Sequence, residues 1–263
     1  MLYQPHEIEI SQRYLQTVVS KLKEPVCMLG GWAVYITVGD SFRREHGRDY
    51  LGSRDIDLGF HIDKNWRRSE LESSDFSLAI RTMHEMGFEY LSFRLVKHFH
   101  ADTRRELKEE EAIKIPSYEM FDLFVDPVVD HIHPEAHEIF GFVPIDEPLL
   151  EQVFLHERCR TPELFGRKIL LPFPAVLLAT KLRSVQQRDR EHKRVKDVTD
   201  IYALSWYSDE QLASLKKALA AIIPPQETRA IVDSFTREDL DSVSNVLDIE
   251  TAQIRRVLDE LKS

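Results

Sequence analysis

The spacing of apolar residues changes near residue 173, and this change constrains the fold more than any other feature of the sequence. Before it, short apolar segments such as RDIDLGFHI and EMFDLFVDP are typical of β-strands. After it, AVLLATKLRSVQQRD and KRVKDVTDIYALSWY repeat their apolar residues at helical spacing. Strands followed by helices predict an α+β fold. We therefore expect a mixed β-sheet flanked by helices over residues 1–172 and an α-helical domain over residues 173–263.

Individual elements can be predicted from the same patterns and from turn residues. Pro127 should end the strand that precedes it, because proline cannot donate to a β-ladder. The charged segment 104–111 should form a solvated hairpin or loop. The elements expected in the first part are a helix over 6–23, a strand over 26–29, a helix opened by Gly30-Gly31, a strand over 54–62, a helix over 69–87, and strands over 88–100 and 119–127.

The composition narrows the class of protein. No apolar run reaches the length of a membrane span, and the start MLYQPHEIEIS lacks the basic-then-apolar order of a signal peptide. The two cysteines, Cys27 and Cys159, stand alone, which is typical of reduced thiols. We therefore expect a cytoplasmic protein without a membrane partner. The formal net charge of −10 argues against nucleic-acid binding over the whole surface but leaves a local basic patch open.

Two aspartates lie one residue apart in the strand-like segment GSRDIDLGF. Side chains two apart on a strand share a face, so Asp55 and Asp57 should repel each other unless a cation lies between them. A divalent metal such as Mg²⁺ fits this need. The alternative is an exposed, salt-bridged strand.

A glycine pair and a later aspartate extend this pattern. Gly30-Gly31 stands between a predicted strand and a predicted helix, where it would let phosphate oxygens approach free backbone N–H groups. Asp122 lies in the middle of the strand over 119–127 and could orient or deprotonate an attacking hydroxyl. Asp126 competes for this role, because residues four apart on a strand point to the same side. The sequence favours Asp122, since Asp126 lies at the strand's expected end.

The order of these motifs resembles the DNA polymerase beta-like nucleotidyltransferase superfamily. The resemblance rests on LGGWAVYITVGD followed by GSRDIDLGF. Downstream, LLATKLRSVQQRDREHKRVKDVTDIYAL is similar to the helical signature of AbiEii-type nucleotidyltransferases, with matching positions at Lys181, Arg188, Lys196, Asp197 and Asp200. The resemblance spans about residues 26–204. It implies a nucleotidyltransferase-type sheet with a C-terminal helical domain.

The resemblance also implies an activity and its residues. The activity is transfer of a nucleoside monophosphate from an NTP to an acceptor hydroxyl, with two Mg²⁺ ions, for which Mn²⁺ could substitute. Leu51 stands where many members carry an arginine, so phosphate contacts in this loop would come from Ser53, Arg54 or Arg48. Metal-binding and catalytic residues would be Asp55, Asp57 and Asp122; nucleotide-binding residues would be Gly30, Gly31, Ser53, Arg54, Lys181 and Arg188.

Lys181 lies among leucines and should be half-buried, so it needs an anion. A nucleotide phosphate, Asp197 or Asp200 would serve. The acceptor stays open among RNA ends (tRNA included), protein side chains and small molecules, and the family includes toxins with a cognate antitoxin. Two other functions also remain open: a non-catalytic nucleotide- or partner-binding module, and a DNA-binding regulator acting through the helix-turn-helix-like segment 238–261.

Overall fold

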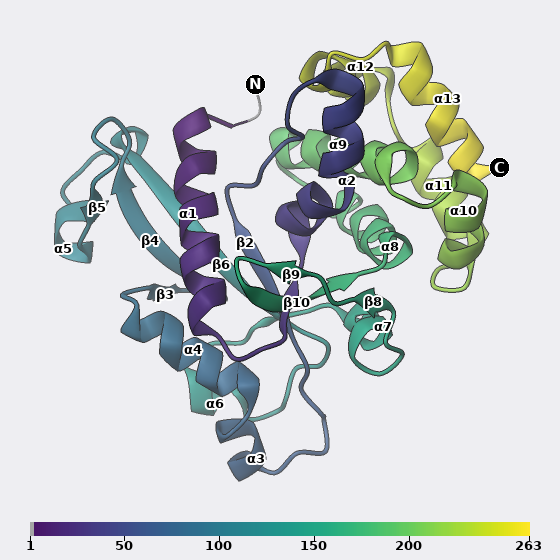
Figure 1. Cartoon of the computed structure of the whole chain (residues 1–263). Helices are drawn as coiled ribbons and strands as arrows, with labels where there is room; N and C mark the ends of the chain where they lie inside the picture. Colours follow the sequence, from purple (N-terminus) through teal and green to yellow (C-terminus); the bar gives the residue numbers. More distant parts are fainter. Residues whose placement is uncertain (1–2) are drawn as a thin grey trace. The chain divides into compact units, whose positions relative to one another are not determined.

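The computed structural model describes residues 3–263, so the first two residues of the predicted 1–172 domain lie outside the described part. The chain divides into two compact units. A sheet unit comprises Tyr3–Trp32 and Gly52–Leu171, and a helical unit comprises Ala33–Leu51 and Pro172–Ser263. Figure 1 shows the elements of both. The fold is α+β with a mixed sheet, as the sequence predicted.

The sheet runs in the order β3-β4-β6-β2-β1-β10-β8, with β5 beside β4, β7 beside β6 and β9 beside β10. β2 pairs in parallel with β6 and antiparallel with β1, so the sheet is mixed. The strands are β1 (Val26–Met28), β2 (Ile56–Phe60), β3 (Glu89–Leu91), β4 (Arg94–His100), β5 (Glu106–Leu107), β6 (Met120–Val129), β7 (Ile145–Asp146), β8 (Cys159–Arg160), β9 (Glu163–Leu164) and β10 (Arg167–Pro172).

The helices of the sheet unit are short apart from α1 and α4. Two 3₁₀ turns, Ser117–Glu119 and Pro148–Leu150, complete the unit. The helices are α1 (Pro5–Lys21), α3 (Arg68–Glu72), α4 (Asp75–Glu85), α5 (Glu109–Ala112), α6 (Ala136–Phe140) and α7 (Glu151–Phe154).

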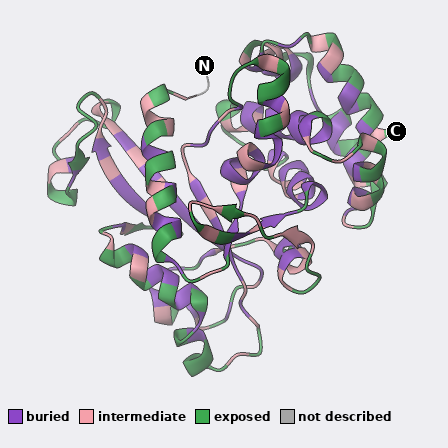
Figure 2. Cartoon of the chain, viewed as in Figure 1, coloured by how far each residue is buried: buried purple, intermediate pink, exposed green. Residues whose placement is uncertain are grey.

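One face of the sheet is covered by α1 and α4. Tyr14 of α1 makes an edge contact with Phe99 of β4 at 5.4 Å between ring centroids. Phe76 of α4 meets Phe60 of β2 in the same way at 5.5 Å. In Figure 2 the central strands are coloured mostly as buried. The opposite face of β2 and β6 carries the polar residues described below.

The predicted helix over 69–87 is interrupted. The first piece ends at Glu72 with Ser73 as its C-cap, and Ser74 caps the second, because its Oγ accepts a hydrogen bond from the backbone N–H of Ser77 at 3.2 Å. Serine at a helix N-cap stabilises a new helix start. The predicted strand over 88–100 is likewise split, because Ser92 has a φ of 60° and turns the chain into the β3–β4 hairpin.

Pro127 does not end its strand, contrary to the sequence prediction. β6 continues to Val129, and Pro127 faces Leu58 of β2 in the ladder. The pairing of β6 with β4 reaches only Val125, so the missing N–H of Pro127 removes no bond to β4. Pro127 therefore lies at a position of β6 that β4 no longer pairs with, and such positions accept proline even within a longer strand.

The helical unit is built around α9, which packs against α8, α12 and α13. Residues 33–51 join it through aromatic contacts: Phe42 of α2 lies 5.1 Å from Tyr207 between ring centroids, and Nε2 of His46 is 2.7 Å from the Tyr207 hydroxyl. The helices are α2 (Gly30–His46), which begins in the sheet unit, then α8 (Pro174–Val185), α9 (Glu191–Tyr207), α10 (Leu212–Ala220), α11 (Pro225–Asp233), α12 (Arg237–Leu247) and α13 (Thr251–Lys262).

Candidate active site

Three aspartates gather on the face of the sheet opposite α1. β2 and β6 run in parallel, and their register places Asp57 directly beside Asp126. Paired residues on neighbouring strands point to the same face, and Asp55, two residues before Asp57, shares that face. The alternate residues, Ile56 and Leu58, are fully buried on the other side. The alternation that the sequence predicted for GSRDIDLGF is present, and it aligns the two aspartates with a third.

Asp57 also lies against the start of α2. A Cβ built on Gly30 would be 1.9 Å from Oδ2 of Asp57, so no side chain other than hydrogen fits there while the carboxylate keeps its place. Gly30 has a φ of +59°, a backbone conformation that favours glycine. The free N–H groups at a helix N-terminus favour negative charge. Because Gly30 has no side chain, the start of α2 can lie against the carboxylate of Asp57.

Arg94, which the sequence analysis did not single out, lies between two of these aspartates. Its Nε and Nη2 donate to Oδ1 and Oδ2 of Asp126 at 2.7 and 2.5 Å, and Nη2 is 3.5 Å from Oδ2 of Asp55. Burial disfavours the charged guanidinium, but the hydrogen bond to Asp126 and the charges of the three aspartates outweigh it and raise the pKa of Arg94. The site therefore contains a permanent cation of its own.

The same register places Asp122, the third carboxylate that the sequence favoured, away from Asp57. Asp122 lies four residues before Asp126 on β6, roughly 13 Å away along the strand. It faces His98 of β4 instead, and Nδ1 of His98 is 2.7 Å from its Oδ1. That hydrogen bond is the main cause of a raised pKa at His98. Asp126, the competing residue, occupies the place beside Asp57, because β6 does not end at Pro127.

Two further sequence candidates lie close to the aspartates in the chain. Arg54 is 3.4 Å from Oε1 of Glu7 on α1, and its guanidinium lies over the ring of Phe121, so it belongs to the α1 side of the sheet. It does not share a face with Asp55 and Asp57. Ser53 is buried. Arg48, the third possible source of phosphate contacts, belongs to the helical unit and donates to the carbonyl of Leu247.

Lys181 and Arg188 take part in an ion cluster within the helical unit. Nζ of Lys181 is 2.7 Å from Oδ1 of Asp197 and 2.8 Å from Oδ2 of Asp200. Nε of Arg188 donates to Oδ2 of Asp197 at 2.6 Å, and the Tyr50 hydroxyl donates to Oδ1 of Asp200 at 2.8 Å. The sequence suggested a nucleotide phosphate, Asp197 or Asp200 as the anion for Lys181, and in the structure both aspartates contact it. The helical motif thus forms one connected network.

Burial and ion pairing have opposite effects on the charged groups of this cluster. Desolvation opposes the charge of Lys181, yet Asp197 and Asp200 overcome it and raise the pKa of Lys181. Desolvation also opposes the charge of Asp197, but Lys181 and Arg188 lower its pKa overall. Lys196 contacts Asp200 at 2.5 Å, but burial dominates there and lowers the pKa of Lys196. Arg188 is the most exposed of the three cations. Its side chain is 34% exposed, against 11% for Lys181 and 6% for Lys196.

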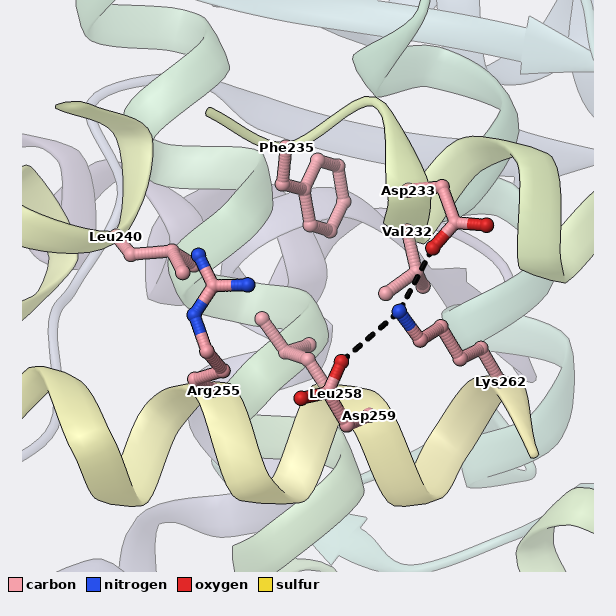
Figure 3. Close-up of a pocket in the computed structure, with 8 residues that line it drawn as sticks. All are labelled: Val232, Asp233, Phe235, Leu240, Arg255, Leu258, Asp259 and Lys262. Atoms are coloured by element: carbon pink, nitrogen blue, oxygen red, sulfur yellow. Dashed lines mark hydrogen bonds and ion pairs between the residues drawn. The ribbon is translucent and has the colours of Figure 1, made fainter. Parts of the chain in front are cut away.

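The segment 238–261 forms two helices, α12 and α13, as expected. Figure 3 shows a small cavity that α13 helps to line, with Lys262 bridging Asp233 and Asp259 at 2.7 and 2.9 Å. Its volume of about 60 Å³ is far below the several hundred Å³ of a typical ligand pocket. On α13, the exposed Arg255 and Arg256 are offset by the exposed Asp259 and Glu260.

The donor set on the sheet fits a hard cation in part. Carboxylate oxygens are the ligands that Mg²⁺ prefers, and Mg²⁺ commonly takes one or two carboxylates and completes its shell with water and phosphate oxygens. Asp55 and Asp57 match that pattern. Within residues 3–263, however, no three His, Cys, Asp or Glu side chains are arranged to hold a metal ion by themselves. Asp126, which would be the third, is held by Arg94.

Comparisons with known proteins give one similarity. No family model matches the chain, and no curated protein matches it. Among solved structures, the chain is similar to an antigenic nucleotidyltransferase-like protein from Paracoccidioides brasiliensis, with 17% sequence identity over 92% of this chain and 93% of that one, and a TM-score of 0.36. A likeness at this level assigns no activity. Along residues 3–263, every helix is too short or too polar to span a lipid bilayer.

Proposed function

We propose that the chain is a Mg²⁺-dependent nucleotidyltransferase that moves a nucleoside monophosphate from an NTP to an acceptor hydroxyl. The observation that carries this proposal is the in-register placement of Asp57 beside Asp126, with Asp55 on the same face and the start of α2 at Gly30 against Asp57. Paired carboxylates beside a glycine-opened helix suit a metal-bound triphosphate. The carboxylates bind the metal cation, and the N–H groups at the helix start bind the negatively charged phosphates. The order of motifs that resembles the nucleotidyltransferase superfamily agrees with this geometry.

Each group at the site has its own role in the proposed reaction. Asp55 and Asp57 would hold Mg²⁺, which supplies a Lewis acid that neutralises charge on the reacting phosphate. The N–H groups at the start of α2 would bind phosphate oxygens, and Gly30 leaves room for them. Both oxygens of Asp126 accept hydrogen bonds from Arg94, so Asp126 would position that guanidinium. The acceptor oxygen would attack the α-phosphorus, pyrophosphate would leave, and the acceptor's proton would pass to water.

The acceptor and the nucleotide base belong to the same proposal. The AbiEii-type signature between residues 177 and 204 favours a member of that group, whose toxins act with a cognate antitoxin. The basic members of this segment, including the more exposed Arg188, suit a polyanionic acceptor such as tRNA. Protein hydroxyls and small molecules such as aminoglycosides are the competing acceptors, and the test is designed to separate them.

The test is transfer of label from each α-³²P-labelled NTP, with Mg²⁺, to a mixed pool of tRNA, protein and aminoglycoside. Wild type should label one acceptor class, and Asp55→Ala/Asp57→Ala should lose at least about 10³-fold in rate, because the metal-binding oxygens are gone. Asp102→Ala, a change at an exposed turn, is the matched control and should keep full activity. Label transfer that survives in the double variant would overturn the proposal. NTP binding without transfer would support a binding module instead.

A further inference from the structure

The hairpin between β3 and β4 brings two exposed apolar side chains to the edge of the aspartate site. Leu91 and Arg94 are paired across this hairpin, so Ser92 and Phe93 form a two-residue turn between them. Ser92 has a φ of 60°, and tight hairpin turns need a positive φ at a central residue. Leu91 is 48% exposed and Phe93 is 41% exposed. We call these two side chains the apolar rim.

The apolar rim adjoins the face of the sheet that carries the aspartates. Paired residues of neighbouring strands point to the same face, so Leu91 shares a face with Arg94. Arg94 in turn donates to Asp126, and Asp126 is paired with Asp57. One row of side chains thus crosses the sheet from β2 through β6 and β4 to β3, with carboxylates at one end and a leucine at the other.

Phe93 lies close to the charged part of this row. The central carbon of the Arg94 guanidinium is 5.6 Å from the ring centroid of Phe93. The same guanidinium binds Asp126 and is 3.5 Å from Oδ2 of Asp55. Neighbouring strands are about 4.8 Å apart, so Arg94, two strands from Asp57, is roughly 10 Å from it along the row. One ligand of nucleotide size can therefore contact both the aspartates and the ring of Phe93.

The proposed binding of the triphosphate gives such a ligand a direction. The start of α2, which follows β1, would bind the terminal phosphates, and the metal at Asp55 and Asp57 would bind the α-phosphate. In the sheet order, β1 and β6 lie on opposite sides of β2. The nucleoside is attached to the α-phosphate, at the opposite end of the molecule from the γ-phosphate. An extended nucleotide with its terminal phosphates at α2 therefore places its nucleoside over β6 and β4, toward the apolar rim.

We propose, resting on the function proposed above, that the apolar rim is the subsite for the nucleotide base, which stacks on the ring of Phe93 and contacts Leu91. Every base has a flat π-face, so stacking on an aromatic side chain tolerates any base. Leucine and phenylalanine side chains carry no hydrogen-bonding group. The rim therefore favours a nucleotide over a bare phosphate chain and does not distinguish the four bases by hydrogen bonds.

The test compares two ligands that differ in the base. Titration calorimetry with Mg²⁺ measures binding of the α,β-methylene analogue of each NTP, which cannot release pyrophosphate, and of ribose 5-triphosphate, which has no base. Phe93→Ala should bind the analogues at least about 5-fold more weakly than wild type does, because the stacking partner is lost. Its affinity for ribose 5-triphosphate should be unchanged. Phe93→Trp keeps a flat ring and should bind the analogues as wild type does.

Tyr118→Ala is the matched control. Tyr118 is also an exposed aromatic residue, at 81%, and it lies in the turn before β6, at the other end of that strand from Asp126. The variant should bind both kinds of ligand as wild type does. Far-UV circular dichroism of each variant checks that the fold is kept.

The outcomes separate this inference from the function on which it rests. Unchanged binding of every analogue by Phe93→Ala would overturn the base subsite and leave the nucleotidyltransferase proposal standing. An equal loss for the analogues and for ribose 5-triphosphate would also overturn the subsite, because Phe93 would then act on the phosphates through Arg94. Wild type that binds neither kind of ligand with Mg²⁺ would overturn the proposed function, and this inference with it. A loss confined to the analogues, and regained in Phe93→Trp, would support both.

Discussion

The sheet unit and the helical unit each contain a cluster of carboxylates and cations, and the two clusters have opposite charge. On the sheet, three aspartates surround Arg94, with Asp55 still 22% exposed. In the helical unit, Lys181, Lys196 and Arg188 surround Asp197 and Asp200, whose side chains are 2% and 0% exposed. The first cluster lies at a partly open face, and in the second the buried carboxylates are bonded to lysine and arginine.

This difference predicts that the two clusters respond differently to added metal. A partly open carboxylate cluster can gain a cation from solution. In a buried cluster, the carboxylates are already bonded to lysine and arginine. Loss of one of these partners leaves a buried charge unpaired and lowers the stability of the fold. Four measurements test this difference between the clusters and the contacts around them.

The largest effect is expected for Lys181→Met. The change leaves Asp197 and Asp200 buried with less than their full compensation, and should lower the free energy of unfolding by about 3–5 kcal/mol. Urea denaturation measures it. Lys216→Met is the control, because Nζ of Lys216 donates to the hydroxyl of the exposed Ser263, and it should change stability by less than about 0.5 kcal/mol. Wild-type stability with weakened NTP binding would instead place Lys181 in phosphate contact.

Arg94→Met should have a smaller effect on stability, about 2–3 kcal/mol, because its partners are more exposed than Asp197 and Asp200. It should also respond differently to metal. Millimolar Mg²⁺ should restore part of the lost stability of Arg94→Met, since a divalent ion can replace the missing charge, and should restore none in Lys181→Met. Thermal unfolding with Mg²⁺ or EDTA measures this. Equal responses of the two variants would contradict the distinction between the clusters.

Gly30→Ala should cost about 1–3 kcal/mol, because the new methyl group meets the carboxylate of Asp57 at a left-handed backbone position. Gly39→Ala, in the same helix and with no atom within 4 Å of the new Cβ, should stabilise by about 0.5–1 kcal/mol. Opposite signs in urea denaturation would tie the glycine requirement to Asp57. A neutral Gly30→Ala would show that the carboxylate moves away freely.

The smallest effect concerns His98 and Asp122. The folded pKa of His98 is raised, so the stability that the pair contributes is fully present below about pH 6.5, the unfolded value, and is lost as the pH rises through the folded value. For this half-buried pair, Asp122→Asn should cost up to about 1 kcal/mol at pH 6 and less at pH 9. Denaturation at both pH values, with Asp102→Asn as control, measures it. A cost that grows with pH would contradict the assignment.

Much of the local structure could be predicted from the sequence because its signals are local. Helical spacing over residues 6–23 predicted α1, and the apolar alternation of RDIDLGFHI predicted β2 with Asp55 and Asp57 on one face. The split at Ser74 and the hairpin at Ser92 were missed, since a cap and a positive φ depend on the exact chain path.

The fold class, the two aspartates on a common face and the glycine before α2 could be predicted without coordinates, because periodicity and backbone freedom are properties of neighbouring residues. Long-range contacts were needed to learn that Asp126 and not Asp122 lies beside Asp57, that Lys181 contacts two carboxylates, and that Arg94 bridges Asp55 and Asp126. These contacts join residues far apart in the chain. Strand register and side-chain burial set them, and a one-residue change of register would have produced a different set.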